Sequence, residues 1–263
     1  MNAPQPLILL TNDDGIMAPG LVALARALAE LGRVVVIAPE RDNSAASHSL
    51  TMRRPLLVRE DGPDRFAIDG TPADCVIVGV GKLLATRPDL LVSGINPGPN
   101  LGDDISYSGT VSAAIEATML GIPALAVSLA VGEDGLDFAP AAACAARLAA
   151  MVLQHGLPPD TLLNINVPGR PTAEIIGVRF TRQGRRKYDG AIQETSDPWN
   201  RKHYWIGGGI PVLDEGADTD VQAVVAGWVS VTPLHLDRTN HDALAFLTRS
   251  WGDLLQNQKE EEK

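Results

Sequence analysis

Two adjacent carboxylates, Asp13 and Asp14, follow the apolar run of residues 7–10 near the start of the chain. Like charges at short range raise each other's pKa, so neighbouring acids at one turn favour a site for a cation. Carboxylate and amide oxygens are the ligands that Mg²⁺ and Mn²⁺ select. The pair therefore indicates a divalent metal site. The simpler alternative is that one Asp caps the following helix and the other points to solvent.

Other oxygen-bearing side chains follow two further apolar runs. Asn43 and Ser44 come after residues 33–39, and Asn96 comes after residues 88–94. The carboxyl ends of parallel strands open onto one crevice of an α/β sheet, so we expect these side chains to converge with Asp13 and Asp14. A ligand set without His or Cys favours Mg²⁺ or Mn²⁺ over zinc.

The segment Ser108-Gly109-Thr110 precedes an expected helix over residues 111–120. Free backbone amides and the positive end of the helix dipole make such a helix start a phosphate site. The alternative is that Thr110 is only an N-cap. Joined to a metal site, a phosphate cradle indicates chemistry on a phosphate group.

The elements that must position these residues alternate between strand and helix. Short, continuously apolar runs predict strands buried on both faces, as in parallel sheets, and helical spacing follows them. We therefore expect an α/β core with a mostly parallel sheet. The expected strands are residues 7–10, 33–39, 88–94, 124–128, 162–167, 175–180 and 228–234, with a hairpin at 56–59 and 65–68. The expected helices are residues 16–31, 72–83, 111–120, 139–154, 219–227 and 243–255.

The composition limits the function classes. Acids outnumber bases 32 to 22, a net charge of −10, which argues against sequence-independent binding of nucleic acid, and we expect no nucleic-acid partner. Cys75 and Cys144 lie in apolar helical patterns with no metal-site spacing, which indicates a reducing compartment. No signal peptide or membrane-spanning run is apparent, so we expect a cytoplasmic protein without a membrane partner.

The character of the chain changes in its C-terminal third. Residues 181–209 mix basic side chains, aromatic side chains and glycines without core-like periodicity, and we expect an arm or β excursion that meets another subunit or covers the site. We divide the chain into a catalytic core (1–175), a β extension with the final strand (176–240) and a C-terminal helix with a charged tail (241–263). No linker separates these parts into independent domains.

Several long motifs, in order, resemble the stationary-phase survival protein SurE family. They are Leu10-Thr11-Asn12-Asp13-Asp14-Gly15, residues 38–45, residues 92–100 and Ser106-Tyr107-Ser108-Gly109-Thr110-Val111. With residues 219–234, the resemblance covers nearly the whole chain. It implies a Rossmann-like three-layer core with a β extension that helps to form homodimers or homotetramers.

The resemblance also implies a metal-dependent phosphomonoesterase that hydrolyses nucleoside 5′- and 3′-monophosphates. One Mn²⁺ or Mg²⁺ per subunit would be held at the positions that match the family's ligands, Asp13, Asp14, Ser44 and Asn96. We expect Asp13, with Asn12, to orient or deprotonate the attacking water. The phosphate oxygens would be held by Asn12, Asn43, Ser108, Gly109 and Thr110.

Other classes of protein fit the sequence less well. A Rossmann dehydrogenase would carry G-x-G-x-x-G after its first strand, where this chain has acids. A haloacid-dehalogenase-type phosphatase would carry a nucleophilic Asp two residues before its acid, which Asn12-Asp13-Asp14 does not supply. A non-enzymatic receiver-like or nucleotide-sensing module remains the alternative, although the chain is about twice the length of one such domain.

Overall fold

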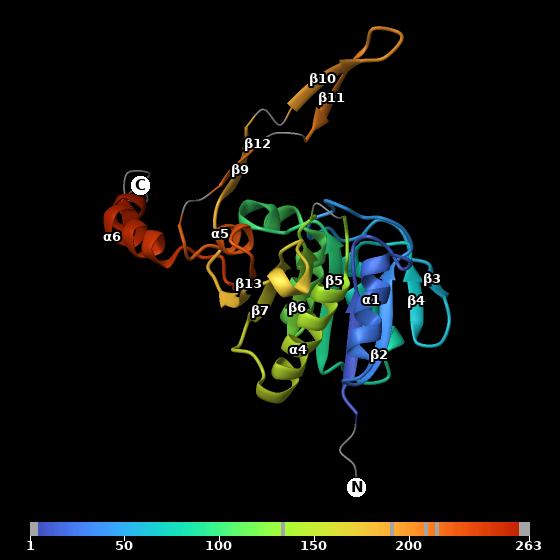
Figure 1. Cartoon of the computed structure of the whole chain (residues 1–263). Helices are drawn as coiled ribbons and strands as arrows, with labels where there is room; N and C mark the ends of the chain where they lie inside the picture. Colours follow the sequence, from blue (N-terminus) through green and yellow to red (C-terminus); the bar gives the residue numbers. More distant parts are fainter. Residues whose placement is uncertain (1–4, 133–134, 190–191, 208–209, 214–215, 258–263) are drawn as a thin grey trace.

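A nine-stranded sheet forms the centre of the described part of the chain (Figure 1). The structure is a computed structural model, which describes residues 5–132, 135–189, 192–207, 210–213 and 216–257. The strands lie in the order β3-β4-β2-β1-β5-β6-β7-β13-β8. Their bounds are β1 (Leu7–Thr11), β2 (Arg33–Pro39), β3 (Val58–Glu60), β4 (Arg65–Ile68), β5 (Leu90–Pro97), β6 (Ala124–Leu129), β7 (Thr161–Val167), β8 (Gly177–Phe180) and β13 (Trp228–His235).

The sheet is mostly parallel, as the apolar runs predict. β1 pairs in parallel with β2 on one side and with β5 on the other, and the parallel pairing continues outward to β4 and through β6 to β7. The pairs β3–β4 and β7–β13 are antiparallel, and the first of them is the expected hairpin. This is the Rossmann-like order. The chain reverses its direction of winding at β1, which opens a crevice between the carboxyl ends of β1 and β5.

Helices cover both faces of the sheet and complete three layers. α1 (Pro19–Leu28) and α4 (Ala139–His155) pack on one face, in front of the strands in Figure 1, and α2 (Pro72–Val78) and α3 (Gly109–Met119) pack on the other. The central strands are buried on both faces, which is why their runs are apolar throughout. A turn of π-helix (Gly79–Leu83) extends α2, and two short 3-10 helices (Gly102–Tyr107 and Thr172–Glu174) lie in loops.

α1 is shorter than the helix expected over residues 16–31. The chain first makes a turn in which Ala18 N–H donates to Gly15 O (3.0 Å), and the helix begins at Pro19. Proline suits a first helical position because its missing N–H has no partner there. The helical spacing of the apolar residues continues beyond both ends of α1 and therefore could not fix its limits.

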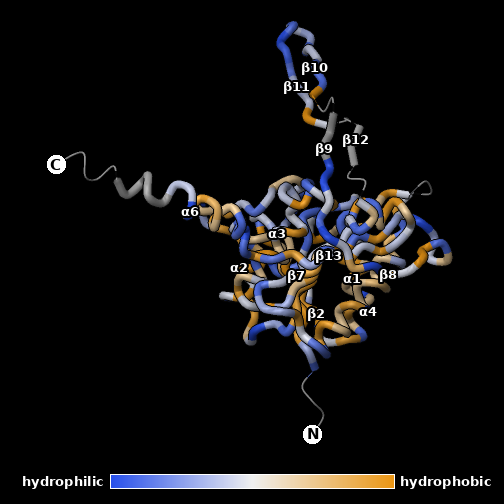
Figure 2. Tube along the Cα trace, turned by 90° about the vertical axis from the view of Figure 1, so that its left-hand side faces the viewer, coloured by the Kyte–Doolittle hydropathy of each residue, from blue (hydrophilic) through white to orange (hydrophobic). Residues whose placement is uncertain are grey.

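Two parts of the C-terminal third leave the body of the core in both views (Figures 1 and 2). The first is an arm made of β9 (Arg186–Asp189) paired with β12 (Ile210–Leu213) and of β10 (Ile192–Ser196) paired with β11 (Lys202–Ile206). The second is α6 (His241–Asn257), which follows β13. The division of the chain at residue 175 stays a prediction, and β8 and β13 pair into the core sheet beside β7.

The last helices differ in how they pack. α5 (Asp220–Val225) contacts β13, with Val221 and Val224 buried against Leu101. Over residues 241–251 of α6, where burial is described, the exposed large apolar side chains are Leu244, Phe246, Leu247 and Trp251. The expected charged tail lies largely outside the described residues. Among the helices of the described residues, none is long and apolar enough to cross a membrane.

Candidate active site

The crevice at the carboxyl ends of β1 and β5 contains a cavity of about 310 Å³. Ligand pockets are usually about 300–1,000 Å³, so the volume suits a small molecule. Side chains from β1, from the loop after β2, from β5 and from the start of α3 line it together. The lining includes Asp13, Asp14, Ser44, Asn96 and Ser108. Positions far apart in the sequence are therefore brought together as the strand ends predict.

Asp13 is buried at the floor of this crevice. Its side chain accepts a hydrogen bond from Thr110 Oγ, and its carbonyl oxygen accepts one from Asn43 N–H (2.7 Å). Burial raises the pKa of the Asp13 carboxyl, and the hydrogen bond from Thr110 acts in the opposite direction. Asp13 thus links the end of β1 both to α3 and to the loop after β2.

Asp14 is half-buried beside Asp13, and one oxygen of its carboxylate lacks a hydrogen-bond partner among the described residues. Its Oδ2 is shielded from solvent and makes no hydrogen bond to any described residue. Desolvation, with repulsion from the charges of Asp13 and Asp42, raises the pKa of Asp14 to about 7. A buried carboxylate oxygen without a donor is costly on its own and suits a cation as its partner.

The turn that carries both acids is held by Asn12. Its Nδ2 donates to Gly15 O (3.0 Å), and Gly15 N–H donates to its Oδ1 (3.2 Å), while the whole side chain is buried. These two hydrogen bonds fix the conformation of the turn that carries Asp13 and Asp14. The N-cap of α1 is Ala18, which makes no capping bond through its side chain. Neither Asp13 nor Asp14 is therefore a cap of α1, and the simpler interpretation of the acid pair does not apply.

The loop after β2 carries Ser44 to the rim of the cavity. Ser44 Oγ donates to Asp42 Oδ1 (2.5 Å), as does Ser44 N–H (2.7 Å), so Asp42 fixes the start of the loop. Further along, His48 Nε2 lies 2.8 Å from Glu116 Oε2 of α3. Contacts at both ends hold the hydroxyl of Ser44 beside the crevice.

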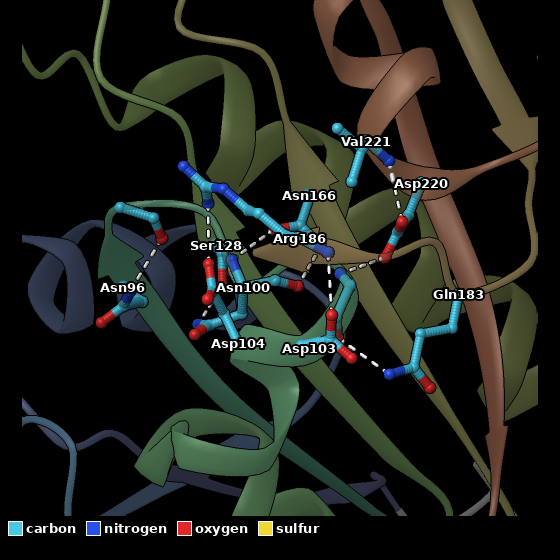
Figure 3. A network of polar contacts seen from close by, with 12 residues as sticks. Asn96, Asn100, Asp103, Asp104, Ser128, Asn166, Gln183, Arg186, Asp220 and Val221 are labelled. Atoms are coloured by element: carbon cyan, nitrogen blue, oxygen red, sulfur yellow. Dashed lines mark hydrogen bonds and ion pairs between the residues drawn. The ribbon is translucent and has the colours of Figure 1, made fainter. Parts of the chain in front are cut away.

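Asn96, at the end of β5, is one of the residues that line the cavity. Figure 3 shows its side chain as sticks. Its Nδ2 donates to Gly98 O (2.7 Å), which turns the amide so that the carbonyl oxygen is the atom left for a ligand. This amide orientation is the one that a metal ligand needs, because metals bind the oxygen of an amide.

The N-terminus of α3 borders the cavity through Ser108. Ser108 is the N-cap, because its Oγ accepts a hydrogen bond from Val111 N–H (3.1 Å), so the alternative in which Thr110 caps the helix is wrong. Gly109 lies so close to the acid that a Cβ there would be 2.7 Å from Asp13 Cβ. A larger residue at position 109 would displace Asp13.

The cavity has further lining residues that the sequence did not single out, among them Asn100, Asp104 and Tyr107. Asn100 is held by Asn166 and Ser128, and Asp104 pairs with Arg186 of the arm (Figure 3). Asp104 and Tyr107 belong to the 3-10 helix Gly102–Tyr107, whose turn brings them to the rim. No spacing rule reveals such a short irregular helix, although the acids at 103 and 104 are visible in the sequence.

The donor set fits a hard divalent cation. The proposed ligands Asp13, Asp14, Ser44 and Asn96 bring two carboxylates, one hydroxyl and one amide to the same cavity. One oxygen of the Asp14 carboxylate is buried without a partner among the described residues. Oxygen ligands of this kind suit Mg²⁺ or Mn²⁺. The N-terminus of α3 lies at the same cavity, and helix N-termini bind anions such as phosphate.

Comparisons with known proteins identify the family of this chain. Residues 8–190 match the family model described as survival protein SurE. The chain is 56% identical over 244 residues to 5'-nucleotidase SurE of Geobacter sulfurreducens, covering 93% of each chain. It is 54% identical to 5'-nucleotidase SurE of Geobacter metallireducens, covering 93% of this chain and 96% of the relative. The crystal structure of the SurE protein from Aquifex aeolicus superposes with a TM-score of 0.82 at 45% identity, covering 93% of this chain and 99% of that one. The chain belongs to the SurE family.

Proposed function

We propose that this protein is a metal-dependent phosphomonoesterase that hydrolyses nucleoside monophosphates to nucleoside and phosphate. The single observation that carries the proposal is Asp14 Oδ2, a buried carboxylate oxygen without a hydrogen-bond donor, in a cavity shared with Asp13, Ser44 and Asn96. The relatives from both Geobacter species are named 5'-nucleotidase, which supports an enzyme over the alternative of a receiver-like or nucleotide-sensing module.

Four residues would hold the metal: Asp13, Asp14, Ser44 and Asn96. Mn²⁺ and Mg²⁺ both suit this oxygen set, and we propose one ion per subunit. When bound, the ion supplies Lewis-acid stabilisation of phosphate oxygens and a lower pKa for bound water. With the chain at a net charge of −10, it also offsets repulsion of a dianionic substrate.

Asp13 is the residue that we propose to orient the attacking water and to accept its proton. Thr110 Oγ donates to one side of this carboxylate, which fixes its orientation and opposes the rise in its pKa that burial causes. A general base must be held within hydrogen-bond reach of the proton it takes, so a fixed carboxylate at the cavity floor suits this role.

The phosphate group would lie against the start of α3. We propose that Ser108, Gly109 and Thr110 face it with the amides and dipole of the helix start, and that Asn43 faces it from the loop after β2. Asn12 bonds to both the N–H and the carbonyl oxygen of Gly15. We therefore assign Asn12 to shaping the turn that presents Asp13 and Asp14 to the metal.

We also propose that the protein is a homo-oligomer, a dimer or tetramer, joined through the arm. In the described part of the arm, Ile192, Trp199, Tyr204, Trp205 and Ile206 are each 60% exposed or more. Clustered apolar and aromatic side chains on a projecting hairpin are typical of interfaces.

Phosphate release from nucleotides tests the proposed function. The protein is dialysed against EDTA and assayed with purine and pyrimidine nucleoside 5′- and 3′-monophosphates, with and without added Mn²⁺ or Mg²⁺. We expect no release in EDTA and recovery with either ion. Full activity after exhaustive chelation would refute the metal site. Tight nucleotide binding by calorimetry without release under any metal condition would favour the signalling alternative.

A further inference from the structure

Tyr107 is a large aromatic residue with an exposed side chain at the wall of the active-site cavity. Tyr107 lines the cavity together with Asp13, Asp14 and Ser108, and the residue is 65% exposed. Among the described residues that line this cavity, Tyr107 alone carries an aromatic ring; the others are acids, amides, hydroxyls, two prolines and an alanine. The ring is therefore the largest apolar surface that the cavity offers to a ligand.

Hydrogen bonds hold the backbone around Tyr107, although its side chain is exposed to solvent. Tyr107 O accepts a hydrogen bond from Ser47 N–H (3.1 Å), and Ser106 O accepts one from Ser47 Oγ (2.8 Å). On its other side, Ser108 caps α3. A ring on a backbone held from both sides loses little freedom when a ligand contacts it, and this pre-organisation favours binding.

The position of the ring relative to the phosphate site suggests what it contacts. Ser108, at the start of α3 where the phosphate is proposed to lie, is the next residue in the chain. A nucleotide bound there by its phosphate places its ribose and base farther out, at the open side of the cavity. Aromatic side chains stack on bases, and because every base has a π-face the contact tolerates any base.

We propose that Tyr107 stacks on the nucleobase and so makes the enzyme prefer nucleotides to phosphate esters without a base, with little selection among bases. This inference rests on the proposed function of the same cavity. The ring contacts the base and not the phosphate. Removing the ring therefore lowers kcat/KM for nucleotides but not for phosphate esters that have no base.

The test compares esters with and without a base. The ratio kcat/KM is measured with Mn²⁺ for AMP, UMP and ribose 5-phosphate on the parent protein and on Tyr107→Ala, Tyr107→Leu and Tyr107→Phe. We expect Tyr107→Ala to lose about tenfold or more on AMP and UMP, the scale of one lost stack, while ribose 5-phosphate changes by less than about twofold. Tyr107→Phe keeps the ring and should resemble the parent, and Tyr107→Leu should resemble Tyr107→Ala.

Phe180→Ala serves as a matched control, since Phe180 is 73% exposed on the edge strand β8. It should leave all three esters unchanged. A second readout is inhibition of ribose 5-phosphate hydrolysis by adenosine, which Tyr107→Ala should weaken by the same factor as it lowers AMP hydrolysis. Equal losses on all three esters, or no loss on any, would overturn the stacking role. A parent protein inactive on all three esters would instead overturn the proposed function, and the inference with it.

Discussion

Arg186 Nη1 lies 2.8 Å from Asp104 Oδ2, and this ion pair joins the base of the arm to the rim of the active-site cavity. Both side chains are 19% exposed, and Arg186 N–H also donates to Asp103 Oδ2 (2.9 Å). Nearby, Gln183 Nε2 donates to Gly102 O (2.8 Å). The first strand of the arm is therefore anchored on the same 3-10 helix that carries Asp104 and Tyr107 into the site.

Replacing Arg186 should weaken substrate binding. In Arg186→Met the positive charge that offsets Asp104 is removed, so a dianionic phosphate ester meets a more negative rim. We expect kcat/KM to fall about tenfold, mainly through a higher KM, as for the loss of roughly 1–2 kcal/mol of charge compensation. The double variant Arg186→Met/Asp104→Asn should recover most of the loss. A double variant as weak as Arg186→Met alone would show that the pair does not act through charge.

Asp14→Asn should be folded and inactive. Asn has the size of Asp, and the N-cap of α1 is Ala18, so the substitution removes a charge without removing a cap. If Asp14 binds the metal, turnover at saturating Mn²⁺ should fall roughly a thousandfold or more. Glu30→Gln, which also removes one carboxylate near the end of α1, is the control and should keep the parent's turnover. Near-parent turnover of Asp14→Asn would refute the proposed ligand set.

The sequence predicts the core of this fold well because buried parallel strands leave a strong pattern. Runs of apolar residues located β1, β2, β5, β6 and β7. Polar residues after β1, after β2 and at the end of β5 line one cavity. The pattern could not predict the exact ends of α1, since helical spacing extends past Pro19 and Leu28 into residues that form turns.

The local geometry of the site could not be predicted from the sequence, for a different reason. Ser108 and Thr110 are both good N-cap residues, and only the path of the backbone decides that Ser108 caps α3 while Thr110 turns to Asp13. Asp104 and Tyr107 reach the cavity through one irregular turn, and contacts with the arm hold that turn. Such long-range contacts have no signature in residue spacing.

The metal-free protein should lose stability as the pH rises. The pKa of Asp14 is about 7 when folded, above its ordinary value of 3.8. In the unfolded chain this carboxyl loses its proton near pH 4, whereas in the folded protein it holds the proton up to about pH 7. Between these values the folded state binds more protons, so the free energy of unfolding falls as the pH rises through this window.

Thermal melts in EDTA across about pH 5 to 8 measure this effect. Asp14→Asn removes the titrating group and should give a flatter dependence, with a higher melting temperature than the parent at the alkaline end. Added Mn²⁺ favours the ionised carboxylate and should raise the parent's melting temperature most at high pH. A metal-free parent that grows more stable from pH 5 to 7 would contradict the assigned burial of Asp14.

Polar substitutions on the arm should dissociate the protein. Trp199, Trp205 and Ile206 are 77%, 67% and 90% exposed in the single chain. Replacing all three with Ser removes apolar area from the proposed interface, so the mass measured by light scattering should fall to that of a smaller assembly. Phe180→Ser, an equally exposed change on β8, should leave the mass unchanged. An arm variant that keeps the parent's mass would place the interface elsewhere.

Removing the hydrogen bond from Thr110 Oγ to Asp13 tests what sets the pKa of the Asp13 carboxyl. Thr110 is fully buried, and its bond lowers the pKa of Asp13 against the rise caused by burial. Thr110→Val keeps the branched shape but removes the donor, so the pKa of Asp13 should rise further. We expect the acid limb of the pH–rate profile, recorded with saturating nucleotide and Mn²⁺, to move to higher pH. The unsatisfied buried carboxylate should also cost about 1–3 kcal/mol of stability in the metal-free protein.

Thr110→Ser separates this effect from packing. It keeps the hydroxyl and loses one buried methyl group, which costs about 1 kcal/mol, so its stability should fall while its acid limb stays where the parent has it. The two variants thus lose similar stability but differ in pH dependence. A Thr110→Val protein whose acid limb coincides with that of the parent would show that Asp13 is not the group that must be ionised for turnover.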